Sequence, residues 1–259
     1  LACLRREYRD IEATIAAKAT ALITISPALS SYFERSYGLK NVFTIPNGYD
    51  EQDLAVAPGK NDFAAGVLHV VHAGKIGLSD STRSLRPFIA AVEHLRQADG
   101  ELGLKLQLHF VGELSAKEKR GLQGLKNAGI AHLYGARDHS FSLAVQQKAD
   151  LFLLITSSVR PGIAPGKLFE YLAQRKPILA LDDGTHAGEI VRATDSGWIV
   201  PAHDVETIAA TLEKIVNDKE FRAMPSGSAA AIGRYAAARQ MEQLNGILQQ
   251  VRSAHGNRP

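Results

Sequence analysis

From residue 67 onward the sequence alternates between short apolar segments and amphipathic segments, and this alternation limits the folds open to the chain. Six segments have the length and composition of buried strands, and a helical pattern follows each of them. The strands are expected at 67–73, 106–110, 131–134, 150–155, 177–181 and 198–200. Strict alternation with short connections builds a parallel sheet covered on both faces. We therefore predict a doubly wound, Rossmann-like α/β domain with a six-stranded parallel sheet.

The residues on either side of this domain have a different pattern. Before it, a strand expected at 42–45 ends at the turn Pro46-Asn47-Gly48, and Ser26-Pro27 has the signature of a helix start. After it, the sequence is rich in Ala and Gln and predicts helix without a further strand. We divide the chain into a fragment of another unit with a hinge (1–46), the doubly wound domain (47–225) and a helical tail (226–259).

The composition excludes several classes of protein. The 259 residues include 30 basic and 27 acidic side chains, and a net charge of +3 gives no argument for a nucleic-acid partner. The single cysteine, Cys3, excludes an internal disulfide framework and fits a reducing compartment. No segment approaches the ~18 apolar residues of a transmembrane helix, so none is expected. Because the chain begins with Leu1 rather than Met, we interpret it as a piece of a longer protein.

The loop at 157–170 carries the most informative pattern. Ligands of doubly wound sheets bind outside the carboxyl ends of the strands, and this Gly- and Pro-rich loop follows a strand and leads into a helix. The backbone amides near Gly166 and Lys167, the helix dipole and the lysine charge predict a phosphate site. Glu170, in the first turn, could accept hydrogen bonds from ribose hydroxyls. The motif alone leaves open a simple capped helix with a solvated lysine.

Two further cations flank the loop after the first strand of the domain. Lys75 and Arg83 could clamp a diphosphate through charge-assisted hydrogen bonds, and the alternative is a solvated loop. A P-loop NTPase is disfavoured, because the spacing from Gly162 to Gly166-Lys167 is one residue short and Leu168 replaces the magnesium-binding Ser or Thr.

Metal and nucleophile motifs find no support. His69 and His72 are three residues apart on a strand, so they face opposite sides of the sheet and cannot share an ion. There is no Asp-x-Asp motif, and we expect no metal cofactor. The acidic pair Asp182-Asp183 before Gly184 is typical of a turn. No Gly-x-Ser-x-Gly motif is present, and no catalytic residue can be assigned.

Taken together, these motifs resemble the nucleotide-sugar-dependent glycosyltransferases of the GT-B fold, closest to glycosyltransferase family 4. The matching segments follow the family's order along the chain: 22–29, 45–50, 108–113, 134–135, 149–155, 165–173, 176–180, 188–190 and 197–200. The resemblance implies that 47–225 is the C-terminal, donor-binding half of a GT-B fold and that 1–46 ends an N-terminal acceptor domain.

The resemblance also implies roles for individual residues in phosphate and ribose binding. Lys75 and Arg83 match the basic residues that hold the diphosphate of the donor. Gly166 and Lys167 match the phosphate-facing start of a helix, and Glu170 matches the acid that binds the ribose.

The resemblance further places the base of the donor and exposes one departure. Tyr134 and Gly135 fall where family members contact the base. Many members carry a second acid eight positions before the one matching Glu170, and Gly162 stands there in this chain. We therefore take Gly162 and the nearby Arg160 as candidate contacts of the donor sugar.

The leading hypothesis is a glycosyltransferase that moves a sugar from a nucleoside-diphosphate-sugar to a glycan or lipid-linked acceptor in cell-surface polysaccharide biosynthesis. The resemblance implies a cytoplasmic location, with peripheral association of the full protein at the inner face of the membrane. This fragment alone is expected to be inactive, because the acceptor half is missing. The alternatives are a nucleotide-sugar epimerase on the same fold and a non-catalytic nucleotide-sugar binding module.

Overall fold

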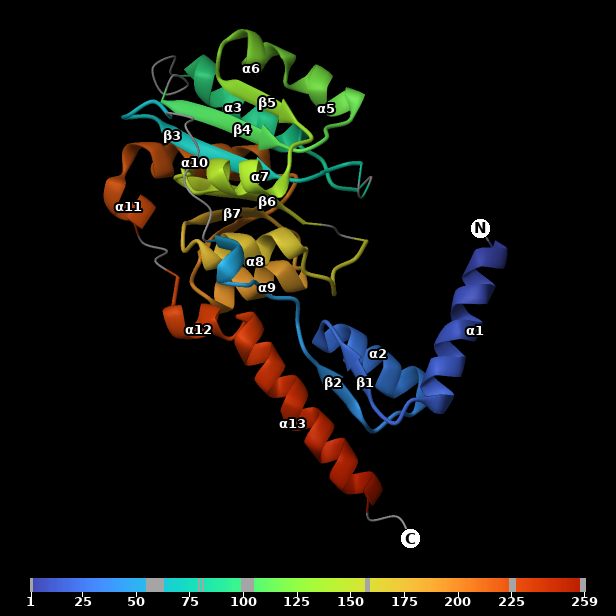
Figure 1. The fold of residues 1–259 in the computed structure, drawn as a ribbon. Helices are drawn as coiled ribbons and strands as arrows, with labels where there is room; N and C mark the ends of the chain where they lie inside the picture. The colour runs from blue at the N-terminus through green and yellow to red at the C-terminus, as the bar shows by residue number, and fades with distance from the viewer. Residues whose placement is uncertain are drawn as a thin grey trace.

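The computed structural model describes residues 2–54, 63–78, 80, 82–98, 105–156, 159–223 and 227–256. Its centre is a six-stranded parallel sheet with the strand order β5-β4-β3-β6-β7-β8, which confirms the predicted sheet (Figure 1). The strands are β3 (Leu68–Ala73), β4 (Leu106–Val111), β5 (Ala131–Gly135), β6 (Leu151–Ile155), β7 (Ile178–Leu181) and β8 (Gly197–Val200). The chain winds outward from β3 to β5 and then returns to β6 beside β3. The order of the strands therefore reverses between β3 and β6.

Helices cover both faces of this sheet, as a doubly wound domain requires. One face packs against α3 (Arg86–Ala98), α5 (Ala116–Gly121), α6 (Gln123–Asn127) and α10 (Val205–Asn217). The other packs against α7 (His139–Gln146), α8 (Gly166–Ala173) and α9 (His186–Ala193). All six residues of β3 are buried, because this central strand has neighbours on both edges and helices on both faces.

The carboxyl end of β3 is fastened to α8 by a buried tyrosine. The backbone N–H of Ala73 donates a 2.8 Å hydrogen bond to the hydroxyl of Tyr171, and the Tyr171 ring stacks on Phe152 at 4.1 Å between centroids. Tyr171 is completely buried. This contact fixes the first turns of α8 against the loop that follows β3.

Tyr171→Phe is expected to lower the free energy of unfolding by about 1–3 kcal/mol, because it leaves the buried N–H of Ala73 without its acceptor. Urea unfolding measures the change. Tyr32→Phe is the matched control, since the Tyr32 hydroxyl bonds Glu12 on the exposed surface and its loss costs at most about 0.5 kcal/mol. An unchanged stability for Tyr171→Phe would show that the hydroxyl does not fasten the strand.

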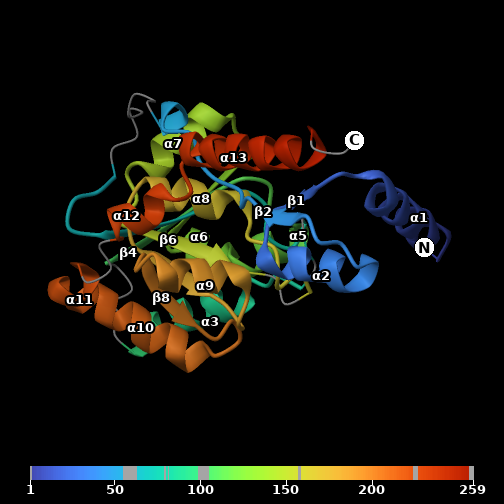
Figure 2. The same cartoon turned by 90° about the horizontal axis from the view of Figure 1, so that it is seen from below.

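A separate small unit precedes the sheet domain. It contains α1 (Ala2–Lys18), β1 (Leu22–Thr24), α2 (Pro27–Tyr37) and β2 (Val42–Thr44), and β1 and β2 form a two-stranded parallel sheet. The predicted helix start is confirmed, because the Ser26 hydroxyl accepts a 3.3 Å hydrogen bond from the Leu29 N–H. Figure 2 shows this unit on the side of the molecule away from α10 and from α11 (Lys219–Ala223).

The C-terminal tail is joined by backbone hydrogen bonds to Tyr49, which follows the leading unit. It forms α12 (Ala229–Gly233) and α13 (Ala237–Gly256). A short 3-10 helix at Gln52–Leu54 lies between β2 and β3. The backbone of Tyr49 accepts from the Ala237 N–H at 2.9 Å and donates to the Tyr235 carbonyl at 3.0 Å. Ile232 of α12 is buried in the core on the α8 face.

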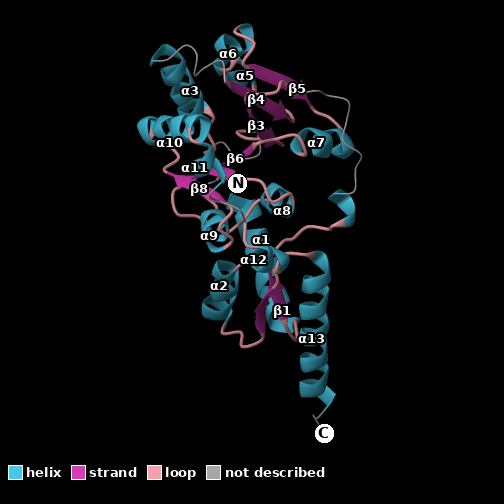
Figure 3. Cartoon of the chain, turned by 90° about the vertical axis from the view of Figure 1, so that its left-hand side faces the viewer, coloured by secondary structure: helices cyan, strands magenta, loops and turns pink. Residues whose placement is uncertain are grey.

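As a result, α13 projects from the sheet domain on the same side as the leading unit (Figures 1 and 3). The tail is helical as predicted, but its first helix packs within the sheet domain. The predicted boundary at 225–226 and the first two residues of the 157–170 loop lie outside the described residues.

Candidate functional site

A cavity of about 400 Å³ opens at the carboxyl ends of β3, β4 and β5, close to the point where the strand order reverses. Its lining comes from the ends of these strands, the loops after them, α7 and α8: residues 73–75, 111–113 and 136–139 with Ser142, Lys167 and Glu170. In open α/β sheets this is where ligands bind. The topology therefore brings Lys75, Lys167 and Glu170, three residues singled out from the sequence, around one cavity.

Two glycines make the floor of the cavity possible. Gly74 and Gly112 have φ angles of +90° and +132°, in a region that side chains disfavour. A Cβ on Gly112 would lie 2.7 Å from the carbonyl oxygen of Gly74, and a Cβ on Gly74 would lie 3.2 Å from Nζ of Lys167. The two turns can therefore lie against each other and leave space for the lysine only because both residues lack a side chain.

Lys167 enters this space and is held from two sides. Its Nζ donates to Nε2 of His72 at 3.0 Å and to the backbone carbonyl of Lys75 at 3.3 Å. Nδ1 of His72 lies 2.8 Å from the carbonyl oxygen of Leu153. A carbonyl oxygen can only accept, so Nδ1 carries the proton of the ring and Nε2 is the acceptor of the lysine N–H. The solvated lysine of the simpler sequence interpretation is wrong.

The charges around Lys167 favour an anion. Burial and, to a smaller extent, the nearby charge of Arg83 lower the pKa of Lys167 to about 7, against the opposite effect of Glu170. Burial and the charge of Arg160 lower the pKa of Arg83. Positive groups that repel one another in a partly buried place are stabilised when an anion binds between them.

Lys75 and Glu170 complete the polar wall of the cavity. Nζ of Lys75 lies 3.2 Å from Oε2 of Glu113, and both side chains are more than half exposed, so this ion pair contributes little and can open for a ligand. Oε2 of Glu170 accepts a 3.3 Å hydrogen bond from Nε2 of the buried Gln146. Glu170 is thereby oriented from behind by α7.

The remaining phosphate and sugar candidates do not line the cavity: Arg83 is half-buried, and Arg160 is exposed. Gly166 is exposed at the first position of α8, next to Lys167. Gly162 packs against the leading unit, where a Cβ would lie 2.9 Å from Cβ of Ala28. The departure from the family's second acid thus has a packing reason, because there is no room for a side chain at this position.

The base candidates Tyr134 and Gly135 also lie at the rim. The Tyr134 hydroxyl is 2.9 Å from Nδ1 of His109, and the Gly135 carbonyl accepts from the Gly112 N–H at 2.8 Å. The residues directly after them line the cavity, among them Arg137, whose Nε donates to the Tyr134 carbonyl at 3.1 Å.

Five polar residues of the lining were not predicted from the sequence: Glu113, Arg137, Asp138, His139 and Ser142. Glu113 and Asp138 lie two and three residues after the ends of β4 and β5, so a place in the loop after a strand is the signal that could have found them. Ser142 lies on α7 and carries no such signal.

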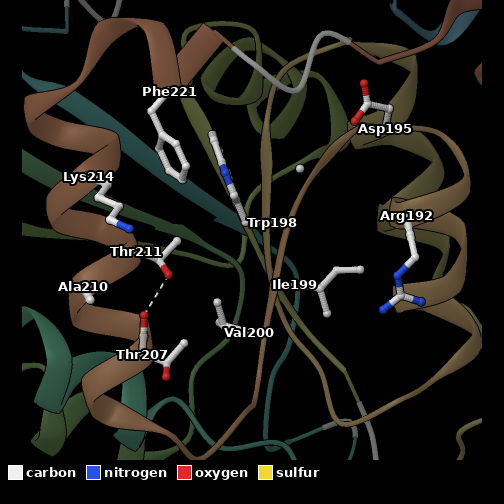
Figure 4. Close-up of a pocket in the computed structure, with 11 residues that line it drawn as sticks. Arg192, Asp195, Trp198, Ile199, Val200, Thr207, Ala210, Thr211, Lys214 and Phe221 are labelled. Carbon is white, nitrogen blue, oxygen red and sulfur yellow. Dashed lines mark hydrogen bonds between the residues drawn. The ribbon is translucent and has the colours of Figure 1, made fainter.

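A second cavity, of about 610 Å³, lies along the edge strand β8 (Figure 4). Figure 4 shows Trp198 and Phe221 on the α10 side of the strand and Arg192 on the α9 side. Trp198 and Phe221 stack at 5.1 Å and pack against the core. This cavity contains none of the residues predicted from the sequence and lies away from the reversal of the strand order, so we place the functional site in the first cavity.

The histidines are arranged as the sequence predicts. His69 contacts His109 whereas His72 contacts Lys167, so the two histidines of β3 have different partners. In the described ranges no cluster of three or more His, Cys, Asp or Glu side chains is placed to hold a metal ion. The helices that the structure describes include none with the length and hydropathy needed to cross a bilayer.

The chain is similar to a known family in sequence and to solved structures in fold. Residues 67–218 match the sequence model of the family described as glycosyl transferases group 1. No curated protein sequence matches the chain.

Among solved structures, S. aureus TarM is similar with a TM-score of 0.68 and 17% identity, covering 93% of this chain and 46% of its own. Anabaena HepE in complex with UDP has a TM-score of 0.67 and 17% identity, covering 91% of this chain and 65% of its own. WaaG, a glycosyltransferase involved in lipopolysaccharide biosynthesis, has a TM-score of 0.61 and 17% identity, covering 89% and 61%. The chain thus spans about half to two thirds of these proteins. On its family match and its fold, it belongs to the glycosyl transferases group 1 and forms the Rossmann-like, C-terminal half of a GT-B fold.

Proposed function

We propose that the 400 Å³ cavity binds a nucleoside-diphosphate-sugar, with the diphosphate on Lys75, Arg83 and Lys167 and the ribose on Glu170. The observation that carries this proposal is the position of Lys167 and Glu170. They lie one turn apart on α8 and line the same cavity at the strand reversal, so one ligand can reach a cation and a hydroxyl acceptor together. The base would lie over residues 134–139, and Arg160 would face the sugar.

In the whole protein we propose transfer of that sugar to a glycan or lipid-linked acceptor in cell-surface polysaccharide biosynthesis, on the cytoplasmic side of a membrane. Residues 1–46 would then belong to the acceptor domain. The chain's own contribution to the reaction is electrostatic: its cations stabilise the negative charge that develops on the leaving diphosphate. The match of this chain to a glycosyltransferase family favours transfer over an epimerase or a binding module without activity.

Binding of UDP and GDP to the chain, followed by isothermal titration calorimetry, tests the proposed site. At least one nucleoside diphosphate is expected to bind, and to bind more tightly than its nucleoside, because the protein cations meet the phosphate charge. No binding of any nucleoside diphosphate would overturn the proposal.

The same cations make a protein-bound divalent ion unnecessary, and we propose that none is used. The affinity for the bound nucleoside diphosphate is therefore expected to stay within about twofold after dialysis against EDTA. A loss of binding that Mg²⁺ restores would contradict this part of the proposal. Product analysis on the full-length protein distinguishes transfer from epimerisation.

A further inference from the structure

His72 has no place in the function proposed so far, although it is the nearest polar side chain to the phosphate-binding lysine. It is 2% exposed and does not line the cavity, yet its Nε2 lies 3.0 Å from Nζ of Lys167. We propose that His72 is a positioning residue, whose neutral ring holds the ammonium of Lys167 in place for the phosphate of the donor. The inference rests on the proposed function, because it concerns the same diphosphate.

The hydrogen bonds on both ring nitrogens fix His72 in one role. The Nδ1–H of His72 donates a 2.8 Å hydrogen bond to the Leu153 carbonyl, so Nε2 is the acceptor that faces Lys167. The lysine ammonium has three N–H donors, and His72 with the Lys75 carbonyl engages two of them. A lysine side chain loses rotamer entropy when a ligand orders it, and ordering it beforehand removes that loss from binding.

A neutral acceptor does this without cancelling the charge. A carboxylate in the place of His72 would form an ion pair with Lys167, as Glu113 does with Lys75, and would compete with the phosphate. Burial and the charge of Lys167 hold the pKa of His72 well below its ordinary value, so the ring stays uncharged. Arg83 from the loop before α3 and Glu170 from α8 are the other charged groups that act on the ammonium.

Other features of the fold support the pair. Gly74 leaves space for the end of the lysine side chain, since a Cβ there would lie 3.2 Å from Nζ. The Tyr171 hydroxyl bonds the backbone of Ala73, the residue after His72, and so fixes the strand and α8 to each other. Histidine and lysine are 95 residues apart in the sequence and meet because β3 and α8 are joined at this point.

A double-mutant cycle tests the proposal with the 259-residue chain and UDP, or GDP if that is the nucleotide that binds. His72→Leu is expected to weaken binding at least about fivefold in the otherwise unchanged chain. In a Lys167→Met background the same change is expected to alter binding by less than about twofold, because the group through which His72 acts is gone. His72→Gln offers a donor and an acceptor on one amide, and is expected to stay within about threefold of the unchanged chain.

His69→Leu is the matched control, since it removes a buried histidine from the same strand that does not contact Lys167. It is expected to leave the affinity for inorganic pyrophosphate, which has no base, unchanged. Nitrogen chemical shifts of the histidine rings give a second measurement that needs no variant. They are expected to show His72 neutral with its proton on Nδ1.

The outcomes separate the two proposals. If Lys167→Met leaves nucleotide binding unchanged, the proposed site is wrong. If Lys167→Met weakens binding but His72→Leu does not, or if the two effects multiply in full, His72 does not act through Lys167 and the inference is wrong. A His72 ring protonated on Nε2 would also overturn it, whether or not His72→Leu folds.

Discussion

Lys167→Met is expected to weaken binding of the nucleoside diphosphate about 10- to 150-fold, which corresponds to a charge-assisted hydrogen bond of about 1.5–3 kcal/mol. Methionine keeps most of the side-chain volume beside Gly74 and removes only the ammonium, so the fold should persist. Calorimetric titration measures the affinity. Glu170→Gln behaves differently, because its proposed partners are ribose hydroxyls. It should weaken the nucleoside as well as the nucleotide, whereas Lys167→Met should spare the nucleoside.

The pH dependence of binding provides a control on this assignment. Burial and the charge of Arg83 lower the pKa of Lys167 to about 7 in the free chain, and only the charged lysine attracts phosphate. As the pH rises above this value the lysine loses its proton, and the affinity should fall about eightfold between about pH 7.5 and about pH 8.5. The terminal phosphate of UDP is already mostly ionised at the start of this interval, because its second pKa is about 6. A lysine with an ordinary pKa would give a flat profile, and Lys167→Met should give one too.

The second large effect concerns stability in acid and arises from a chain of buried hydrogen bonds. The carbonyl of Ala64 lies 2.9 Å from Nε2 of His69, so this nitrogen carries the proton. Nδ1 of His69 then accepts from Nε2 of His109 at 3.0 Å, and Nδ1 of His109 accepts from the Tyr134 hydroxyl at 2.9 Å. Each ring holds one proton, and a second proton on His109 would break the chain.

Burial and, to a smaller extent, the neighbouring His132 and His69 lower the pKa of His109 to about 3. The unfolded chain takes up a proton at this histidine below about pH 6.5, whereas the folded chain does not. The free energy of unfolding therefore falls as the pH drops from about 6.5 towards 3. At pH 5 the loss from His109 is about 2 kcal/mol, and His72, whose pKa burial also lowers, adds a loss of the same sign.

Urea unfolding at about pH 7.5, 6 and 5 measures this dependence. In His109→Gln the slope between about pH 6 and 5 is expected to decrease by about 1.2 kcal/mol per pH unit, close to the value for one proton. His94→Gln, on the exposed surface of α3, is the matched control and should leave the slope as it is. A stability that stays constant from pH 7.5 to 5 would show that these histidines are accessible to protons in the folded chain.

The sequence by itself determined the sheet and the edge at which the site lies. Buried parallel strands need continuous apolar segments. The strands β6 and β7 lie within the apolar segments predicted as strands at 150–155 and 177–181. Local side-chain chemistry likewise fixed a helix start: Ser26 caps α2 as predicted, with its hydroxyl accepting a hydrogen bond from the Leu29 N–H. Because such interactions act within a few residues, the sequence alone is enough to predict them. The choice of Lys167 and Glu170 followed from the same local reasoning, at the start of a helix after a strand.

Only the tertiary structure decided how these parts meet. The sequence pattern separated His72 from His69 but gave no partner for it, and the partner is a lysine 95 residues away. It left Gly162 as an unexplained departure, and the reason is Ala28 of the leading unit. It set the tail apart, although Tyr49 and Ala237 share a backbone hydrogen bond. Each of these contacts joins segments that are far apart in the chain. The energy of such a contact depends on the distance between atoms that only folding brings together. No local pattern of residues therefore predicts the contact.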